Sequence, residues 1–180
     1  MTTQHSTPIG IESLFSIRDK VALVTGGSRG IGLMIARGSA AAGAKVYISS
    51  RTADVCGAGA EELSEVGRCI SLPADLSTMK GVEFLSKAIS EREEKLHILV
   101  NNAGAAWGEP IETFPEKGFD KVTDLNLKSL FFLTRELLPM LEKAATPEDP
   151  ARVLNIGSID GLRVPFVPNF SYAAAKAAVH

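Results

Sequence analysis

The sequence predicts an α/β fold in which a doubly wound parallel sheet carries helices on both faces. Short apolar runs recur along the chain, and each is followed by a segment with the period of an amphipathic helix. Most of these runs stop at glycines or small polar residues, which is typical of strands buried on both faces. With 180 residues, of which 45% are hydrophobic, the chain is long enough for one domain with a buried core.

The first half of the chain supplies three strand–helix pairs. Residues 21–24 form a continuous apolar run that ends at a glycine loop, as expected for a buried parallel strand. Residues 31–42 follow as an amphipathic helix of small residues, which Gly43 closes. The alternation then repeats twice. It predicts strands over residues 45–48 and 68–72, and helices over residues 53–66 and 80–95.

The second half continues the same pattern. Residues 96–100 predict a fourth strand, and residues 117–145 predict a long helix. Pro139 either bends this helix or marks its last turns. Residues 153–156 predict a fifth strand, which an alanine-rich helix follows after a loop. Ligands of such sheets bind beyond the carboxyl ends of the strands. The chemically suggestive residues all lie at strand ends: 26–32, 49–51, 75, 101–104 and 158.

Composition and charge argue against several classes of partner. The formal net charge is −2 and Lys and Arg do not cluster, so neither nucleic acid nor an anionic membrane is expected. No apolar run approaches the ~18 residues that span a bilayer, and no secretory signal is evident, so we expect a cytoplasmic protein. The two cysteines and three histidines are scattered, which predicts packing or surface roles and no metal site.

A glycine-rich loop separates the first strand from the first helix. Gly26, Gly30 and Gly32 form the pattern G-x-x-x-G-x-G. Glycines permit a tight turn there and let the backbone approach a pyrophosphate at the helix N-terminus. The position of this loop between a buried strand and a helix predicts a dinucleotide site.

Two arginines indicate which dinucleotide is bound. In dinucleotide-binding folds an acidic residue after the second strand accepts the ribose hydroxyls, whereas a nearby arginine accommodates a 2′-phosphate. Here the second strand runs into Ser49-Ser50-Arg51 without a carboxylate, and Arg29 lies in the glycine loop. Two guanidinium groups can bind a phosphate bidentately, although simple solvation of both is the alternative. The sequence therefore favours NADP(H) over NAD(H).

Tyr172 and Lys176 lie four residues apart, so on a helix both side chains share one face. A free tyrosine, whose pKa is near ~10, is a poor proton donor at neutral pH. An ammonium group at about 5 Å stabilises the phenolate by about 3 kcal/mol, so the pair can pass a proton to a carbonyl oxygen. Ser158, fourteen positions upstream of Tyr172, can hold that oxygen. Taken alone, the pair also fits a plain surface helix.

Together these residues resemble the motifs of the short-chain dehydrogenase/reductase family, in order and spacing, over about residues 20–180. Within that family the chain looks most like the 3-oxoacyl-(acyl carrier protein) reductases of the rhamnolipid-biosynthesis type. The narrower likeness lies in residues 24–32, 73–76, 104–108 and 151–158. The family motifs are Thr25-Gly26-Gly27-Ser28-Arg29-Gly30-Ile31-Gly32, Asp75, Asn101-Asn102-Ala103-Gly104, Asn126, Ser158 and Tyr172-x-x-x-Lys176.

The resemblance implies a Rossmann-like fold and NADPH-dependent reduction of a carbonyl, with a 3-oxoacyl thioester as the expected substrate. Tyr172 would be the general acid, and Ser158 would hold the substrate oxygen. Lys176 would stabilise the phenolate and hydrogen-bond the nicotinamide ribose, and Asn126 would anchor a water that relays protons from Lys176. Hydride transfer itself is the chemistry of the cofactor.

The resemblance also implies a set of cofactor-binding residues. Asp75 would accept from the adenine amino group, and residues 102–104 would line the adenosine side. Asn101 fits a structural role in tying adjacent strands together. The full set is Gly26, Ser28, Arg29, Gly30, Ile31, Gly32, Arg51, Asp75, Leu76, Asn102, Ala103, Gly104, Tyr172 and Lys176.

The family pattern continues past His180 with the rest of this helix and two more strands. We therefore interpret the chain as an N-terminal fragment of a homo-oligomeric reductase. Residues 1–20 are expected to be a flexible segment, and residues 21–180 an NADP-binding Rossmann domain that is incomplete at its C-terminus. The fifth strand is then expected to be an exposed apolar sheet edge, with Tyr172 and Lys176 poorly fixed.

Two classes of function stay open. The first is an NADP(H)-dependent reductase acting on a 3-oxoacyl thioester, with a sugar, polyol or steroid alcohol as the alternative substrate. The second is a non-catalytic nucleotide-binding or interaction protein that keeps the fold. Residues 161–170 contain several apolar side chains that suggest a substrate wall or, equally, a packed loop.

Overall fold

The computed structural model describes residue 10 and residues 14–180. The expectation of a flexible segment over residues 1–20 therefore falls largely outside the described residues and stays a prediction. No helix within the described ranges combines the length and the apolarity needed to cross a membrane.

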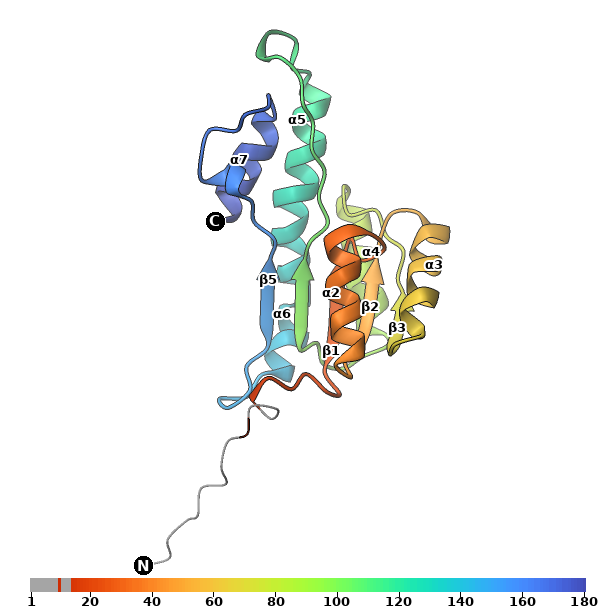
Figure 1. Ribbon diagram of the computed structural model, residues 1–180. Coiled ribbons are helices and arrows are strands. Elements are labelled where there is room, and N and C mark those ends of the chain that lie inside the picture. The colour runs from red at the N-terminus through yellow and green to blue at the C-terminus, as the bar shows by residue number, and fades with distance from the viewer. Residues whose placement is uncertain (1–9, 11–13) are drawn as a thin grey trace, which may run out of the picture.

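Within the described residues, five parallel strands form one sheet in the order β3-β2-β1-β4-β5 (Figure 1). The chain moves outward from β1 to β3, then returns across the centre to β4 and on to β5. This reversal confirms the predicted doubly wound sheet and places a topological switch point between β1 and β4. The strands are β1 (Val21–Thr25), β2 (Lys45–Ser49), β3 (Arg68–Ser71), β4 (Ile98–Asn101) and β5 (Arg152–Asn155).

Helices cover both faces of the sheet, as the continuous apolar strands require. In Figure 1, α2 lies in front of the sheet and α6 behind it. Alternate residues of β1 feed two separate cores: Leu23 packs with α4 and α6, whereas Ala22 and Val24 pack with α2 and α3. The helices are α2 (Gly30–Ala41), α3 (Ala53–Ser64), α4 (Met79–Ser90), α5 (Glu116–Thr123), α6 (Ser129–Ala144) and α7 (Phe170–Val179), with short turns η1 (Ile111–Thr113) and η3 (Ile159–Gly161).

The long helix predicted over residues 117–145 contains a π-helical segment, η2 (Asp124–Lys128), between α5 and α6. Neither the pattern nor Pro139 predicts this widening. Pro139 lies inside α6 and does not end it. Because Pro139 and Arg135 are both exposed, water can reach the Arg135 carbonyl that loses its helical partner.

The third predicted helix was too long, because α4 ends at Ser90 and not at Lys95. Glu93 turns toward the sheet instead. Its carboxylate accepts a hydrogen bond from the Tyr47 hydroxyl at 2.6 Å and pairs with Lys45. The pKa of Glu93 is lowered, since the favourable bonds to Lys45 and Tyr47 outweigh the burial that opposes them. This long-range contact lies just past the end of α4, where the local pattern continued the helix.

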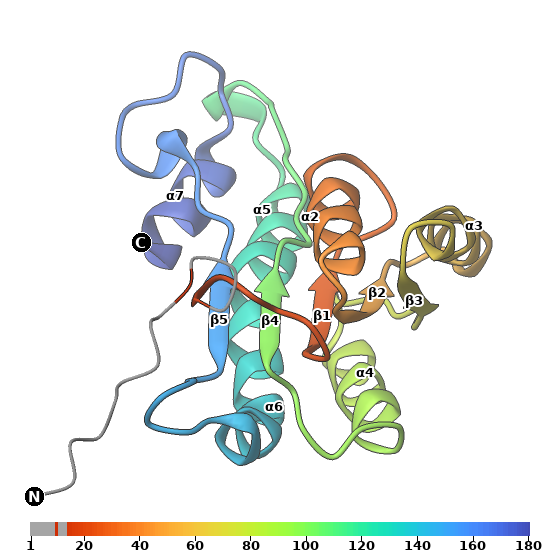
Figure 2. The ribbon, with the colours of Figure 1, turned by 60° about the horizontal axis from the view of Figure 1, so that its bottom comes forward.

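Strand β5 borders the sheet and pairs with β4 alone among the described strands. All four of its residues are exposed, including Val153 and Leu154. The prediction of an exposed apolar edge is confirmed. Helix α7 packs beyond the carboxyl end of β5, against α5, the π segment and η3 (Figure 2).

Candidate active site

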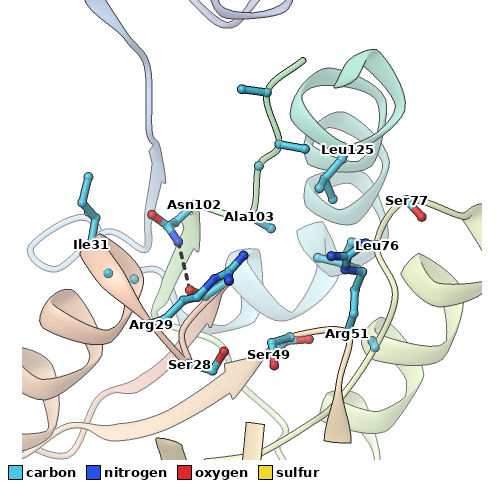
Figure 3. Close-up of a pocket in the computed structure, with 18 of the residues that line it drawn as sticks. Ser28, Arg29, Ile31, Ser49, Arg51, Leu76, Ser77, Asn102, Ala103 and Leu125 are labelled. Atoms are coloured by element: carbon cyan, nitrogen blue, oxygen red, sulfur yellow. Dashed lines mark hydrogen bonds between the residues drawn. The ribbon is translucent and has the colours of Figure 1, made fainter. Parts of the chain in front are cut away.

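A pocket of about 780 Å³ opens beyond the carboxyl ends of β1, β2 and β4 (Figure 3). This volume lies within the ~300–1,000 Å³ of typical cofactor sites. Most of the residues predicted to bind the cofactor line the pocket. They are Gly26, Ser28, Arg29, Gly30, Ile31, Gly32, Arg51, Leu76, Asn102, Ala103 and Gly104.

The glycine loop needs its glycines for two separate reasons. Gly26 and Gly30 have positive φ angles of 63° and 55°, which other residues rarely adopt. Gly32 allows a close approach, because a Cβ there would lie 2.2 Å from the carbonyl oxygen of Gly26. Helix α2 begins at Gly30, so its N-terminal N–H groups face the pocket where an anion would sit.

Hydrogen bonds from the end of β4 hold this loop. Asn102 Nδ2 donates to the carbonyl oxygens of Thr25 at 2.9 Å and Gly26 at 3.2 Å. The Thr25 hydroxyl donates to Val100 and accepts from the N–H groups of Asn102 and Ala103, each at 3.0 Å. Side chains thus join the loops that follow β1 and β4 into one pocket floor.

Asn101 ties neighbouring strands together, as its predicted structural role requires. Its Nδ2 donates to Asn155 Oδ1 of β5 at 2.9 Å and to the Thr134 hydroxyl of α6 at 3.0 Å. The side chain is buried and contributes no lining to the pocket.

Three cations line the pocket: Arg29, Arg51 and Lys121. No Asp or Glu side chain is among the described residues that line it. In Figure 3, Arg29 and Arg51 extend into the pocket from the loops that follow β1 and β2. Lys121 comes from α5, where its Nζ lies 5.2 Å from the ring centroid of Trp107. The pocket is therefore suited to a ligand with several negative charges.

Asp75 lies at the rim of the pocket, outside its lining. Its Oδ1 accepts from the N–H of Ser77 at 3.1 Å and from the Ser77 hydroxyl at 2.8 Å. The carboxylate thereby fixes the turn that brings Leu76 and Ser77 to the pocket.

Sequence reasoning missed part of the lining. Ser49 is the most informative of these residues: the sequence marks its position at a strand end but assigns it no role, and its hydroxyl is buried with no hydrogen-bond partner among the described residues. A buried hydroxyl that faces a pocket in this way can hydrogen-bond a ligand. The missed residues are Ser49, Ser50, Ala74, Ser77, Ala105, Ala106, Lys121 and Leu125.

Ser158 lies just beyond β5, at the start of η3. Its Oγ accepts a hydrogen bond from the N–H of Asp160 at 3.2 Å. Because that bond uses a lone pair of the oxygen, the hydroxyl proton stays available for donation to another acceptor.

Tyr172 and Lys176 both lie on α7, so the predicted i, i+4 pair is present. Lys176 is 5% exposed, and its ammonium donates to the carbonyl oxygen of Ile156. The expectation that this lysine is poorly fixed was wrong, because η3 packs closely on α7 at Gly161. Burial lowers the pKa of Lys176 from its ordinary value. The Lys176 Nζ lies 5.7 Å from the centroid of the Tyr172 ring.

Asn126 lies in the π segment, where its side chain is buried. The amide accepts from the N–H of Ala105 at 2.7 Å and donates to the Ala105 carbonyl at 2.9 Å. Ala105 lines the pocket, and the π segment packs against α7. Asn126 thus connects the pocket wall with the helix of Tyr172 and Lys176. None of Ser158, Asn126, Tyr172 and Lys176 lines the pocket itself.

Comparisons with known proteins agree with this arrangement. The family described as short chain dehydrogenase matches residues 20–180. The rhamnolipids biosynthesis 3-oxoacyl-[acyl-carrier-protein] reductase of Pseudomonas aeruginosa is 47% identical over 92% of this chain. The chain spans 65% of the length of that relative. An uncharacterised oxidoreductase of Bacillus subtilis is 35% identical, over 89% of this chain and 61% of its own length.

Solved structures give the same result. A structure described as the Pseudomonas aeruginosa RhlG/NADP active-site complex matches with a TM-score of 0.89 at 47% identity, covering 92% of this chain and 65% of that one. A metagenomic short-chain oxidoreductase in complex with NADP matches with a TM-score of 0.82 at 31% identity, covering 91% and 73%. The chain therefore belongs to the short-chain dehydrogenase/reductase family.

Proposed function

We propose that this sequence forms the dinucleotide-binding and catalytic part of an NADPH-dependent carbonyl reductase. One observation carries the proposal: a serine with an available hydroxyl proton, a Tyr–Lys helix pair and the glycine loop all lie beyond the carboxyl ends of the strands. Proton donors beside a dinucleotide pocket suit the reduction of a carbonyl.

The pocket supports NADP(H) as the cofactor. The N-terminus of α2 and the glycine loop suit a pyrophosphate, and Arg29 and Arg51 suit a 2′-phosphate. The lack of a lining carboxylate among the described residues removes the charge that would repel that phosphate. Two solved relatives are named as complexes with NADP.

The residues near α7 have separable roles in this proposal. When bound, NADPH supplies the hydride that reduces the carbonyl carbon. Ser158 donates its hydroxyl proton to the substrate oxygen in a hydrogen bond, and Tyr172 transfers a proton to that oxygen. The ammonium of Lys176 stabilises the resulting phenolate, and its N–H groups not used by Ile156 can bind the ribose.

Asn126 has a positioning role that its geometry supports. Because the side-chain amide holds both polar backbone groups of Ala105, it keeps the pocket wall next to α7. The relay water predicted at Asn126 would use the hydrogen-bonding capacity that Ala105 leaves free on this residue.

A 3-oxoacyl thioester is the proposed substrate, as in the name of the Pseudomonas aeruginosa relative. The loop before α7 offers exposed apolar side chains to such a substrate, with Val164 88% and Phe166 87% exposed. Phe170 packs edge-on against Phe114, at 5.8 Å between ring centroids, and Arg163 lies over the Phe166 ring.

The test is a fluorescence titration with NADPH and NADH, followed by an assay of NADPH oxidation with acetoacetyl thioesters. Selective NADPH binding with turnover is the expected result. Selective binding without turnover would favour the non-catalytic nucleotide-binding protein, and a failure to bind NADPH would contradict both functions. Turnover of a polyol or steroid alcohol, and not of the thioester, would overturn the substrate assignment alone.

A further inference from the structure

His180 adds a second side-chain bond, beside that of Lys176, between the end of α7 and the Ser158 segment. Its Nε2 lies 3.0 Å from the backbone carbonyl oxygen of Ser158. Because a carbonyl can only accept, the histidine must carry a hydrogen on Nε2 and donate it. Both the neutral Nε2–H tautomer and the imidazolium meet this requirement, so the bond needs no particular charge.

The imidazole ring also packs closely on Gly157. A Cβ at position 157 would lie 2.7 Å from His180 Cε1 and 3.0 Å from Nε2. Gly157 therefore admits the ring, but as a glycine it leaves the backbone before Ser158 free to rotate. The hydrogen bond from His180 restricts that freedom.

Tyr172, Lys176 and His180 follow one another at intervals of four residues, so the C-cap His180 continues the face of α7 that carries the other two. Lys176 donates to the carbonyl of Ile156, and His180 donates to the carbonyl of Ser158, two residues further on. The β4–β5 ladder ends with Asn101 and Asn155, followed by the N–H of Ile156 bonding to Asn101. Beyond that point the segment is held by the η3 turn, in which the N–H of Gly161 donates to the Ser158 carbonyl at 3.0 Å, and by the side chains of Lys176 and His180.

We propose that His180 is a positioning residue for the Ser158 hydroxyl, an inference that rests on the proposed reductase function. The N–H of Asp160 holds Ser158 through Oγ at 3.2 Å, and the carbonyl oxygen of Ser158 accepts from both Gly161 N–H and His180. The His180 bond adds to the η3 backbone bonds a link from the end of α7, the helix that carries Tyr172. Since small displacements of an oriented donor reduce the rate strongly, loss of the His180 bond lowers turnover without touching the cofactor pocket.

The test compares variants of the full protein in NADPH-dependent reduction of acetoacetyl thioester. His180→Phe keeps a ring over Gly157 but cannot donate, whereas His180→Gln places an amide N–H near the position of Nε2. We expect His180→Phe to lower kcat about tenfold, and His180→Gln to recover most of it, as for loss and repair of one hydrogen bond. The Kd for NADPH stays within about twofold of the wild type, because no lining residue changes.

A double-mutant cycle separates this role from a general structural one. In a Ser158→Ala background, His180→Phe should lower kcat by less than about twofold, since the group it positions is gone. Wild-type kcat in His180→Phe, or an equal tenfold loss in both backgrounds, would overturn the proposal. If His180→Phe fails to fold, His180→Gln alone tests the proposal: a kcat close to wild type supports it, and a low kcat in the folded variant overturns it. Full activity of Ser158→Ala would instead refute the catalytic role of Ser158 and the inference with it.

Discussion

The two halves of the candidate site are supported in different ways. The pocket rests on β1 and β2, whose strands are almost wholly buried between helices on both faces. Ser158 follows β5, a strand exposed along its whole length at the sheet edge. Backbone turns and the two cores shape the first region, whereas a few bonds from α7 position the second. Changes in the first region should affect binding and stability together, and changes in the second should affect turnover.

Replacing Tyr172 with Phe should give the largest effect. Loss of the proton donor is expected to reduce kcat by about 10²–10⁴-fold while the Kd for NADPH changes by less than about twofold. Steady-state kinetics and a fluorescence titration measure the two quantities. Tyr47→Phe is the matched control, because it removes the hydroxyl bonded to Glu93 and should lower stability by about 1–3 kcal/mol without changing kcat. A Tyr172→Phe protein that keeps most of its activity would remove the acid role.

Replacing Gly32 with Ala tests whether binding and stability are coupled in the pocket. The added Cβ meets the Gly26 carbonyl at 2.2 Å, so the glycine loop must shift. We expect NADPH affinity to fall about 100-fold and the free energy of unfolding to fall by about 2–4 kcal/mol, measured by titration and urea denaturation. Gly38→Ala on the same helix meets no atom within 4 Å and should stabilise by about 0.5–1 kcal/mol. Equal effects at both glycines would contradict the steric argument.

Replacing Arg51 with Asp should alter cofactor choice and leave turnover chemistry intact. A charge-assisted bond to phosphate contributes about 1.5–3 kcal/mol, so the NADPH/NADH ratio of kcat/KM should fall about 10–100-fold. Arg68→Asp, at the amino end of β3, is the control and should not change the ratio. An unchanged ratio in Arg51→Asp would exclude this arginine from phosphate recognition.

The smallest expected effect is a pH dependence of stability, from His97 at the amino ends of β1 and β4. His97 Nδ1 accepts the N–H of Val21 at 3.0 Å. The pKa of His97 is lowered, chiefly by burial and then by the charge of Lys20, with Asp149 and Glu93 opposing and Lys95 assisting. The unfolded chain therefore binds a proton more readily. The stability that neutral His97 contributes is complete above its ordinary pKa of about 6.5. This contribution is lost as the pH falls from there through the lowered pKa of the folded state.

Urea unfolding at a series of pH values measures this effect. His97→Asn, whose Oδ1 can accept the same N–H but does not titrate, should flatten the dependence between pH 5 and about 7. If the pH dependence of the free energy of unfolding persists unchanged in His97→Asn, groups other than His97 cause it. Activity per folded molecule should be the same in His97→Asn as in the wild type, because His97 is remote from both parts of the site.

Local patterns were sufficient to predict the strands, the glycine loop and the residues that follow each strand. They failed where distant contacts decide the outcome. Glu93, just past the end of α4, bonds to Tyr47 of β2, and Asn126 in the π segment bonds to Ala105, a residue 21 positions away. Lys121 resembles an ordinary surface residue until the tertiary fold brings it to the pocket, and nothing in the sequence shows that the Ser49 hydroxyl lacks a partner. Burial of Lys176 likewise depends on the packing of η3.

The Thr25 hydroxyl offers a way to observe the pocket without any ligand. The amide hydrogens of Asn102 and Ala103 both bond to this one buried oxygen. The N–H of Asn102 is shared with the Val100 carbonyl at 3.1 Å, whereas Thr25 is the acceptor for the N–H of Ala103. The Ala103 amide therefore reports the separation of the loops after β1 and β4, and its exchange with deuterated solvent should slow when a dinucleotide holds the two loops closed.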